Sequence, residues 1–177
     1  KESRVTKEDR LMASRQVSCP SCGAEVVFTS LVSVFAVCKF CQSTVLRENM
    51  DVKLLGKMAA LKDDFSPLQL HTAGKVTRAG KSLSFTLIGR ARLRWQRGTW
   101  NEWFMYTDGE TEGWLAEAQG FYMASFPSEA STESLPKREE LLPGATVSLE
   151  GRSFVVEDIK DAECDYSEGE LPFVGVV

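Results

Sequence analysis

The sequence predicts a mainly β protein, in which a small four-cysteine zinc ribbon precedes an antiparallel β-meander and one short helix links them. Two Cys-x-x-Cys pairs flank fifteen mostly apolar residues near the N-terminus. Glycine turn signals recur through residues 68–126 without a helical period. Of the 177 residues, 43% are hydrophobic, which is enough for a packed core. An SH3-like or barrel-like closure of the meander fits this pattern.

Composition divides the chain into consecutive parts. The first is an N-terminal extension, or residues added upstream of a native start at Met12. The parts are the extension at 1–13, the zinc ribbon at 14–48, a short helix and linker at 49–67, and a β-domain at 68–177 with a loop at 127–135.

The metal prediction depends on Cys19, Cys22, Cys38 and Cys41. Each Cys-x-x-Cys turn directs two sulfurs to one point, and Gly23 can adopt the positive φ that such a turn requires. The fifteen-residue spacer fits the zinc pattern of two Cys-x-x-Cys pairs. We therefore expect a closed, structural zinc site with four thiolate ligands and no open position.

Other readings of the cysteines remain. Four thiolates also suit iron, which is the alternative metal. A redox pair is normally single and lies near a βαβ pattern, and disulfides conflict with a reducing compartment. We expect Cys164 to be a small buried hydrophobe and His71, the only histidine, to have a surface or packing role.

The linking helix is expected over residues 49–62. Asn49 or Asp51 can cap it, and apolar residues recur at helical spacing from Val52 to Leu61. Pro67 disfavours helical geometry in the residue before it, so the helix should end there.

Strands and turns fill the β-domain. Turn signals lie at Gly74, Gly80, Gly89, Gly98, Asp108–Gly109 and Gly113. Residues 136–142 can form one helical turn. A second hairpin is expected over 145–159 around Glu150–Gly151, and its sequence is similar to that of the hairpin at Gly74.

Three arginines alternate with apolar residues in the strand I-G-R-A-R-L-R-W, which places Arg90, Arg92 and Arg94 on one face. A three-residue loop at 97–99 would set Arg94 opposite Glu102, and a two-residue loop would set Glu102 opposite Leu93. We expect the longer loop, because it pairs opposite charges across the strands.

This face has two interpretations. It is a basic, aromatic surface that binds a protein or nucleic acid, or a solvated face whose arginines are neutralised by Glu102 and nearby acids. A formal net charge of −4 favours the second. The candidate interaction residues are Arg90, Arg92, Arg94, Trp100, Glu102 and Trp114.

No enzyme is predicted. Carboxylates such as Glu102, Asp108, Glu117 and Glu170 are available, but nothing in the sequence brings two of them together, and no catalytic signature occurs. There is no apolar run near twenty residues and no signal-peptide core, so we expect no membrane span and a cytoplasmic location.

Several short motifs resemble those of an uncharacterised bacterial family, a domain of unknown function whose members often carry an N-terminal zinc-ribbon-like segment. The motifs are C-P-S-C-G, V-F-A-V-C-K-F-C, G-K-M-A-A-L, S-P-L-Q-L, W-N-E-W, G-W-L-A-E-A-Q-G and G-E-L-P. The resemblance implies a bacterial accessory protein, often encoded near genes for polyamine aminopropyltransferase-like and membrane-stress-related proteins. It implies no catalytic residue.

The function expected is therefore a non-enzymatic protein-interaction or scaffold module of a bacterial cytoplasmic complex, with structural zinc. One alternative is nucleic-acid binding through the ribbon and the arginine face. Another is an accessory protein to polyamine-related enzymes that holds a polycation through carboxylates such as Glu102 and Glu117.

Overall fold

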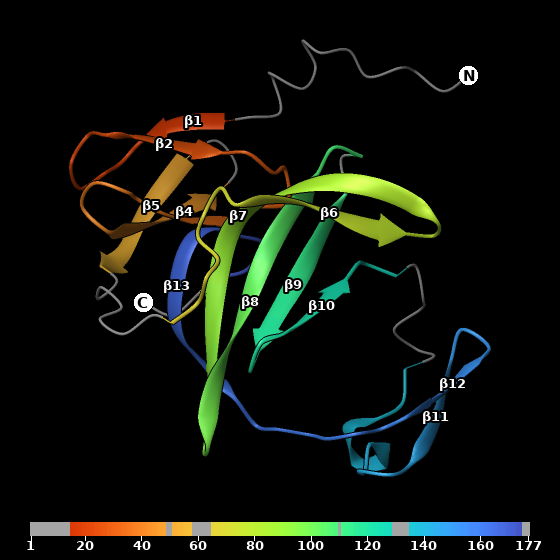
Figure 1. The fold of residues 1–177 in the computed structure, drawn as a ribbon. Coiled ribbons are helices and arrows are strands. Elements are labelled where there is room, and N and C mark those ends of the chain that lie inside the picture. The colour runs from red at the N-terminus through yellow and green to blue at the C-terminus, as the bar shows by residue number, and fades with distance from the viewer. Residues whose placement is uncertain (1–14, 49–50, 58–64, 110, 129–134, 175–177) are drawn as a thin grey trace.

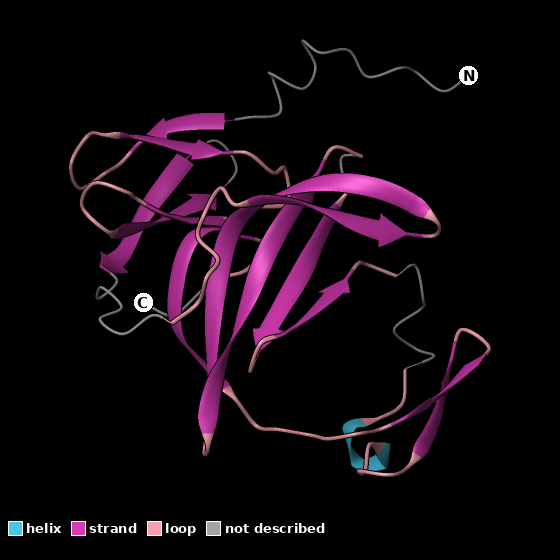
Figure 2. Cartoon of the chain, in the orientation of Figure 1, coloured by secondary structure: helices cyan, strands magenta, loops and turns pink. Residues whose placement is uncertain are grey.

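The computed structural model describes residues 15–48, 51–57, 65–109, 111–128 and 135–174 as an almost entirely β protein (Figures 1 and 2). The expected extension at 1–13 and Met12 lie outside these residues, as do residues 129–134 of the expected loop. The described part contains no helix long and apolar enough to cross a bilayer. The mainly β, antiparallel prediction is confirmed.

The cysteine region supplies five strands and the β-domain supplies eight strands and one short 3-10 turn, η2, among the described residues. The strands are β1 (Arg15–Ser18), β2 (Glu25–Phe28), β3 (Phe35–Val37), β4 (Ser43–Glu48), β5 (Asp51–Lys57), β6 (Ala73–Arg78), β7 (Lys81–Trp95), β8 (Gly98–Thr107), β9 (Glu112–Ala118), β10 (Phe121–Ser125), β11 (Thr146–Leu149), β12 (Arg152–Val155) and β13 (Glu163–Leu171), and η2 is Arg138–Glu140.

One large antiparallel sheet joins the two regions. Its strand order is β10-β9-β8-β7-β13-β3-β4-β5, and β6 pairs with the first half of β7. The last strand, β13, makes the connection, because it pairs with β7 over most of its length and then with β3 through Glu170 and Leu171. The two ends of the sheet, β10 and β5, are not paired with each other, so the barrel closure that we considered does not form.

The predicted linking helix is wrong where the structure describes it. Residues 51–57 form β5, which pairs antiparallel with β4. The apolar residues that fitted a helix also fit a strand: Val52 packs on the cysteine cluster and Leu55 on the sheet core. Tertiary pairing outweighs a weak local preference. Residues 49–50 and 58–62 of the prediction lie outside the described residues.

The strand register of β7 and β8 also differs from the prediction. Trp95 lies opposite Gly98, so the connection is the two residues Gln96 and Arg97. Arg94 therefore faces Thr99, and Glu102 faces Ala91 rather than Arg94 or Leu93. The expected pairing of Arg94 with Glu102 does not form, because the arginines pair with β13, a strand distant in sequence.

Apolar side chains pack on both faces of the sheet. On one face, the buried residues are Phe35, Ile88, Ala91, Phe104 and Leu171, with Trp114 and Cys164 against them. On the other, they are Leu87, Trp103 and Met105, with Leu68, Phe85 and Phe126 against them. Burying each large side chain contributes about 1.5–3 kcal/mol, so these clusters supply most of the stability of the sheet.

One expected turn glycine, Gly89, is instead a point of close approach to Gly169 of β13. Gly89 and Gly169 lie opposite each other in β7 and β13. A Cβ atom on Gly89 would lie 1.7 Å from the carbonyl oxygen of Glu170, and Gly169 has a φ of +68°. Only glycine fits both constraints, and this contact lets β13 cross from β7 to β3.

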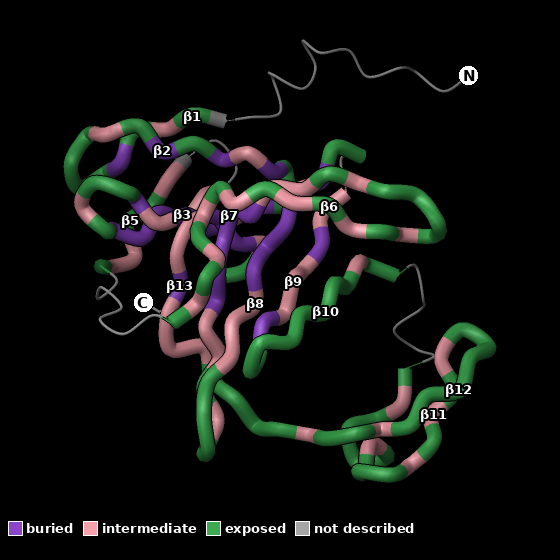
Figure 3. Tube along the Cα trace, viewed as in Figure 1, coloured by how far each residue is buried: buried purple, intermediate pink, exposed green. Residues whose placement is uncertain are grey.

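The second hairpin, β11–β12, forms as predicted, and its strands make a two-stranded sheet of their own (Figure 1). Its turn residues Glu150 and Gly151 have φ values of +50° and +73°, the pattern of a two-residue hairpin turn with both central residues left-handed. The predicted helical turn before it is η2. Figure 3 shows that the hairpin is largely exposed, in contrast to the buried centre of the large sheet.

Candidate metal centre

The two Cys-x-x-Cys turns have the same backbone geometry. The N–H of Gly23 donates to the carbonyl of Cys19, and the N–H of Gln42 donates to that of Cys38, each at 2.9 Å. Gly23 has a φ of +75° and Gln42 one of +58°. The second turn thus adopts the left-handed conformation without glycine, at a cost of about 1–2 kcal/mol. We infer that this strain is retained because the turn must present its two sulfurs correctly.

The four sulfur atoms form one compact cluster. All lie within 4.8 Å of one another. The sulfurs of Cys19 and Cys41 are 3.7 Å apart, and those of Cys22 and Cys38 are 3.8 Å apart. A disulfide requires about 2.05 Å, whereas four ligands at ~2.3 Å from a tetrahedral centre are separated by about 3.8 Å. The cluster therefore has the dimensions of a four-thiolate metal site.

Hydrogen bonds hold the pKa values of two of these thiols far apart. For Cys41, the hydroxyl and N–H of Ser43 lower the pKa to about 6. For Cys22, the N–H of Ala24 favours the thiolate, but the other three thiols and desolvation outweigh it and raise the pKa to about 12. The sulfurs thus share protons among themselves, and a bound cation would displace these protons.

Apolar packing supports the cluster from one side. Cys19 and Cys38 are almost fully buried against Val26, Phe28 and Val45, whereas Cys22 is exposed. The two pairs reach this core from different hairpins, β1–β2 and β3–β4.

A buried carboxylate ties the cysteine region to β13. Glu170 is 6% exposed and accepts hydrogen bonds from the N–H groups of Thr29 (2.7 Å) and Ser30 (3.2 Å). The hydroxyl of Ser30 donates to Glu112 at 2.7 Å. The sequence alone indicated only that Glu170 is an available carboxylate. Its partners are about 140 residues distant, so no local signal could have identified this role.

The arginine row is neutralised by acids of β13. Arg92 makes two hydrogen bonds to Asp165, at 2.8 and 3.0 Å, and Arg94 contacts the same carboxylate. Arg90 is only 2% exposed, and it lies 3.4 Å from Glu168. The structure thus brings the three arginines together on one face, with the carboxylates supplied by a different strand from the one expected.

Desolvation of Asp165 would by itself raise its pKa, but hydrogen bonds and charges from Arg92 and Arg94 outweigh it and lower the pKa. The carboxylate therefore stays ionised well into the acidic range.

The other candidate interaction residues lie elsewhere. The indole N–H of Trp100 donates to Glu102 at 2.9 Å. Burial raises the pKa of Glu102, and this hydrogen bond partly offsets the effect. Trp114 packs between Phe104 and Phe173, with ring centroids 5.0 and 5.8 Å away. It belongs to the core and does not extend the arginine row.

Cys164 packs partly buried against the sheet core, and its thiol lies 3.3 Å from the carbonyl of Tyr166. His71 is exposed and has a φ of +69°. Neither belongs to the four-cysteine cluster.

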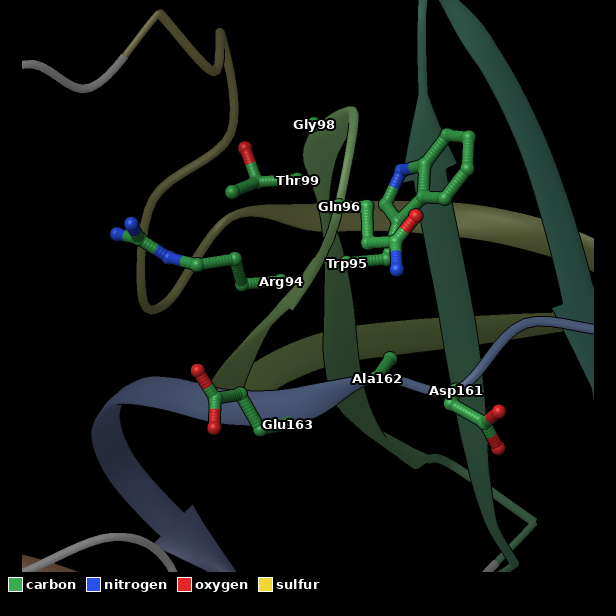
Figure 4. Close-up of a pocket in the computed structure, with 8 residues that line it drawn as sticks. All are labelled: Arg94, Trp95, Gln96, Gly98, Thr99, Asp161, Ala162 and Glu163. Atoms are coloured by element: carbon green, nitrogen blue, oxygen red, sulfur yellow. The ribbon is translucent and has the colours of Figure 1, made fainter.

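An open groove of about 740 Å³ lies at the β7–β8 turn (Figure 4). Figure 4 shows that Arg94 and Glu163 lie on one side of it, whereas Trp95 and Asp161 lie toward the other. Its polar groups therefore do not converge on one point, and we assign it no chemistry.

A family model described as Domain of unknown function (DUF4178) matches residues 75–174. The match covers more than half of the chain and begins after the four cysteines. No curated protein and no solved structure matches the chain.

Proposed function

Because the chain belongs to the DUF4178 family, whose function is unknown, we propose a function from the surfaces of the chain itself. In this proposal it is a non-enzymatic protein-interaction module with structural zinc. Its setting in this proposal is a bacterial cytoplasmic complex. The observation that carries the proposal is the exposed edge strand β10.

Four thiolates at tetrahedral spacing support a structural zinc ion. Cys19, Cys22, Cys38 and Cys41 would supply all four ligands and leave no position for a water or substrate. When bound, the ion would stabilise the small hairpin region. Its proposed role is to hold β3 and β4 in position within the large sheet.

Strand β10 has the features of a docking edge. It ends the large sheet, pairs only with β9 among the described residues, and all five of its side chains are exposed. Phe121 is 79% exposed, Tyr122 48% and Met123 67%. Edge strands normally carry charges or prolines that prevent pairing, and F-Y-M-A-S has neither. An extended segment of another protein could add to this edge through backbone hydrogen bonds.

Nucleic-acid binding has less support. That alternative requires arginines that are available to phosphates, whereas Arg92 and Arg94 already share Asp165 and Arg90 is buried. Salt sensitivity separates the two functions, because phosphate contacts weaken steeply with added salt.

A capture experiment with matched variants tests the proposal. The full chain, tagged and purified from its native cells, should retain a partner that the double variant Phe121→Lys/Met123→Lys loses by at least tenfold. Leu142→Lys is the control, because Leu142 is also exposed (62%) but lies outside β10. Both variants should keep the wild-type circular dichroism spectrum, since the changed side chains are exposed. Capture that is equal in wild type and the β10 variant would contradict a β10 interface.

A further inference from the structure

A polar cleft of about 310 Å³ lies beside β10, where β8, β9 and the β9–β10 turn meet. Glu117 lies in it and is opposite Tyr122 in the register of β9 and β10. Phe65 supplies aromatic surface to the cleft and is 95% exposed. The volume suits one long side chain. Its position means that a strand added to β10 would pass close to the cleft.

Glu117 is a buried carboxylate with one oxygen left available. It is 7% exposed. Its Oε2 atom accepts three hydrogen bonds, from Ser66 Oγ (2.6 Å), Asn101 Nδ2 (3.0 Å) and Trp103 Nε1 (2.9 Å). Among the residues that the structure describes, none donates to Oε1. Oε1 is not among the buried oxygens that lack a partner, so it is accessible and can accept a further donor.

The two arginines that line the cleft already have partners. The Nε and Nη2 atoms of Arg90 both donate to Asn101 Oδ1, at 3.0 and 2.8 Å, and its guanidinium lies 4.7 Å from the ring of Trp103. Arg92 is held by Asp165. The cleft wall has two cations and one carboxylate, but Arg90 pairs with Glu168 and Arg92 with Asp165, so Glu117 is the charged group of the wall without an ion-pair partner among the described residues. The local charge therefore favours a cation over an anion.

We propose that this cleft binds a lysine or arginine side chain from the protein that adds a strand to β10. The inference deepens the proposed function and rests on it. The ammonium or guanidinium group would donate to Glu117 Oε1 in a charge-assisted hydrogen bond. The alkyl stem would lie against Phe65, since long basic side chains pack well on aromatic surfaces.

A nuclear magnetic resonance titration of the full chain tests the cleft directly. The probes are Nα-acetyl-lysine methylamide and Nα-acetyl-arginine methylamide. The reporters are the indole N–H of Trp103 and the side-chain amide of Asn101, because both donate to Glu117. We expect saturable shifts of both signals with at least one probe. Absence of a saturable shift with both probes overturns the proposal, as do saturable shifts with inorganic phosphate alone.

Matched variants assign the effect to the carboxylate. Glu117→Gln keeps the shape and an acceptor oxygen but removes the charge, so affinity should fall at least tenfold. Ala118→Lys places a competing cation at the exposed neighbouring position and should weaken binding similarly. Glu139→Gln, which removes an equal charge from the exposed turn η2, should leave affinity unchanged. Equal affinities of wild type and Glu117→Gln overturn the assignment, and unchanged near-ultraviolet dichroism verifies the fold of each variant.

Two further probes identify the source of the cation. An acetylated and amidated Thr-Val-Lys-Val-Thr peptide should bind at least tenfold more tightly than acetyl-lysine methylamide, and Phe121→Lys/Met123→Lys should abolish that gain. A free linear diamine that binds more tightly than the peptide would overturn the partner side chain as the source. The β10 double variant should still bind acetyl-lysine methylamide, so failure of the β10 interface and failure of the cleft give different results.

Discussion

At the scale of single residues, buried polar groups hold together parts of the chain that are far apart in sequence. Glu170 satisfies two backbone N–H groups of the β2–β3 connection, and its own carbonyl lies against Gly89. One residue thus fixes both the cysteine region and the path of β13. Removing its carboxylate would leave two N–H groups without their acceptor, at about 1–3 kcal/mol for each buried group.

Asp165 gives a prediction about pH. Its pKa is lowered in the folded protein, so the contact with Arg92 and Arg94 stabilises the fold above the unfolded pKa, near ~3.9. This stabilisation is lost as the pH falls through the folded pKa. We expect Asp165→Asn to lower the free energy of unfolding by about 1–3 kcal/mol at pH 7 and by much less near pH 2, as measured by urea denaturation.

The control for this experiment is Asp161→Asn. Asp161 also contacts an arginine, Arg138, but the two side chains are 93% and 61% exposed. Exposed pairs contribute little, so this variant should differ from wild type by less than about 1 kcal/mol at either pH. A pH-independent loss in Asp165→Asn would mean that the residue acts through packing rather than charge.

At the scale of elements, the large sheet and the β11–β12 hairpin differ in what their strands bury. The large sheet packs apolar side chains on both faces. The hairpin has short strands, a separate sheet and an exposed β12 (Figure 3). Isolated two-stranded hairpins are marginally stable in water. The hairpin therefore adds little to the stability of the sheet.

Two phenylalanines test this difference. Phe104 in β8 is 1% exposed, and Phe154 in β12 is 47% exposed. Phe104→Ala should reduce the free energy of unfolding by about 3–5 kcal/mol, because it leaves a cavity in the core. Phe154→Ala should change it by roughly 0.5 kcal/mol or less, by chemical denaturation. A large loss in Phe154→Ala would show that the hairpin packs on the sheet.

At the scale of the whole molecule, the metal site is predicted to stabilise the N-terminal third of the chain. β3 and β4 belong both to the cysteine region and to the large sheet, and β13 connects them to β7. Loss of the metal should therefore loosen residues 15–48 first, while β7, β8 and β9 keep their own core.

Cys38→Ser tests this order of events. Elemental analysis should find about one zinc ion per wild-type chain and none in the variant. Hydrogen exchange should speed up in residues 15–48 and stay slow in β7, β8 and β9. Ser33→Ala is the control, since Ser33 is buried in the same region but is not a ligand. A variant that still bound one ion per chain would rule out the four-thiolate assignment.

Local sequence signals determined several parts of the protein. The spacing of Cys19, Cys22, Cys38 and Cys41 predicted their cluster, because two tight turns can direct four sulfurs to one point without knowledge of the rest of the fold. The Glu150–Gly151 hairpin and the alternation of Arg90, Arg92 and Arg94 were also readable, since turn geometry and strand period involve near neighbours.

Only the tertiary structure decided which distant strands meet. It made residues 51–57 a strand through pairing with β4, and it gave the arginines Asp165 and Glu168 as partners instead of Glu102. It also left one oxygen of Glu117 available in a cleft beside β10. The arginines meet partners that are distant in sequence, whereas β4 and β5 form a local hairpin whose Leu55 packs on the core of the large sheet. In each case, pairing and burial outweigh local preferences of a few tenths of a kcal/mol per residue.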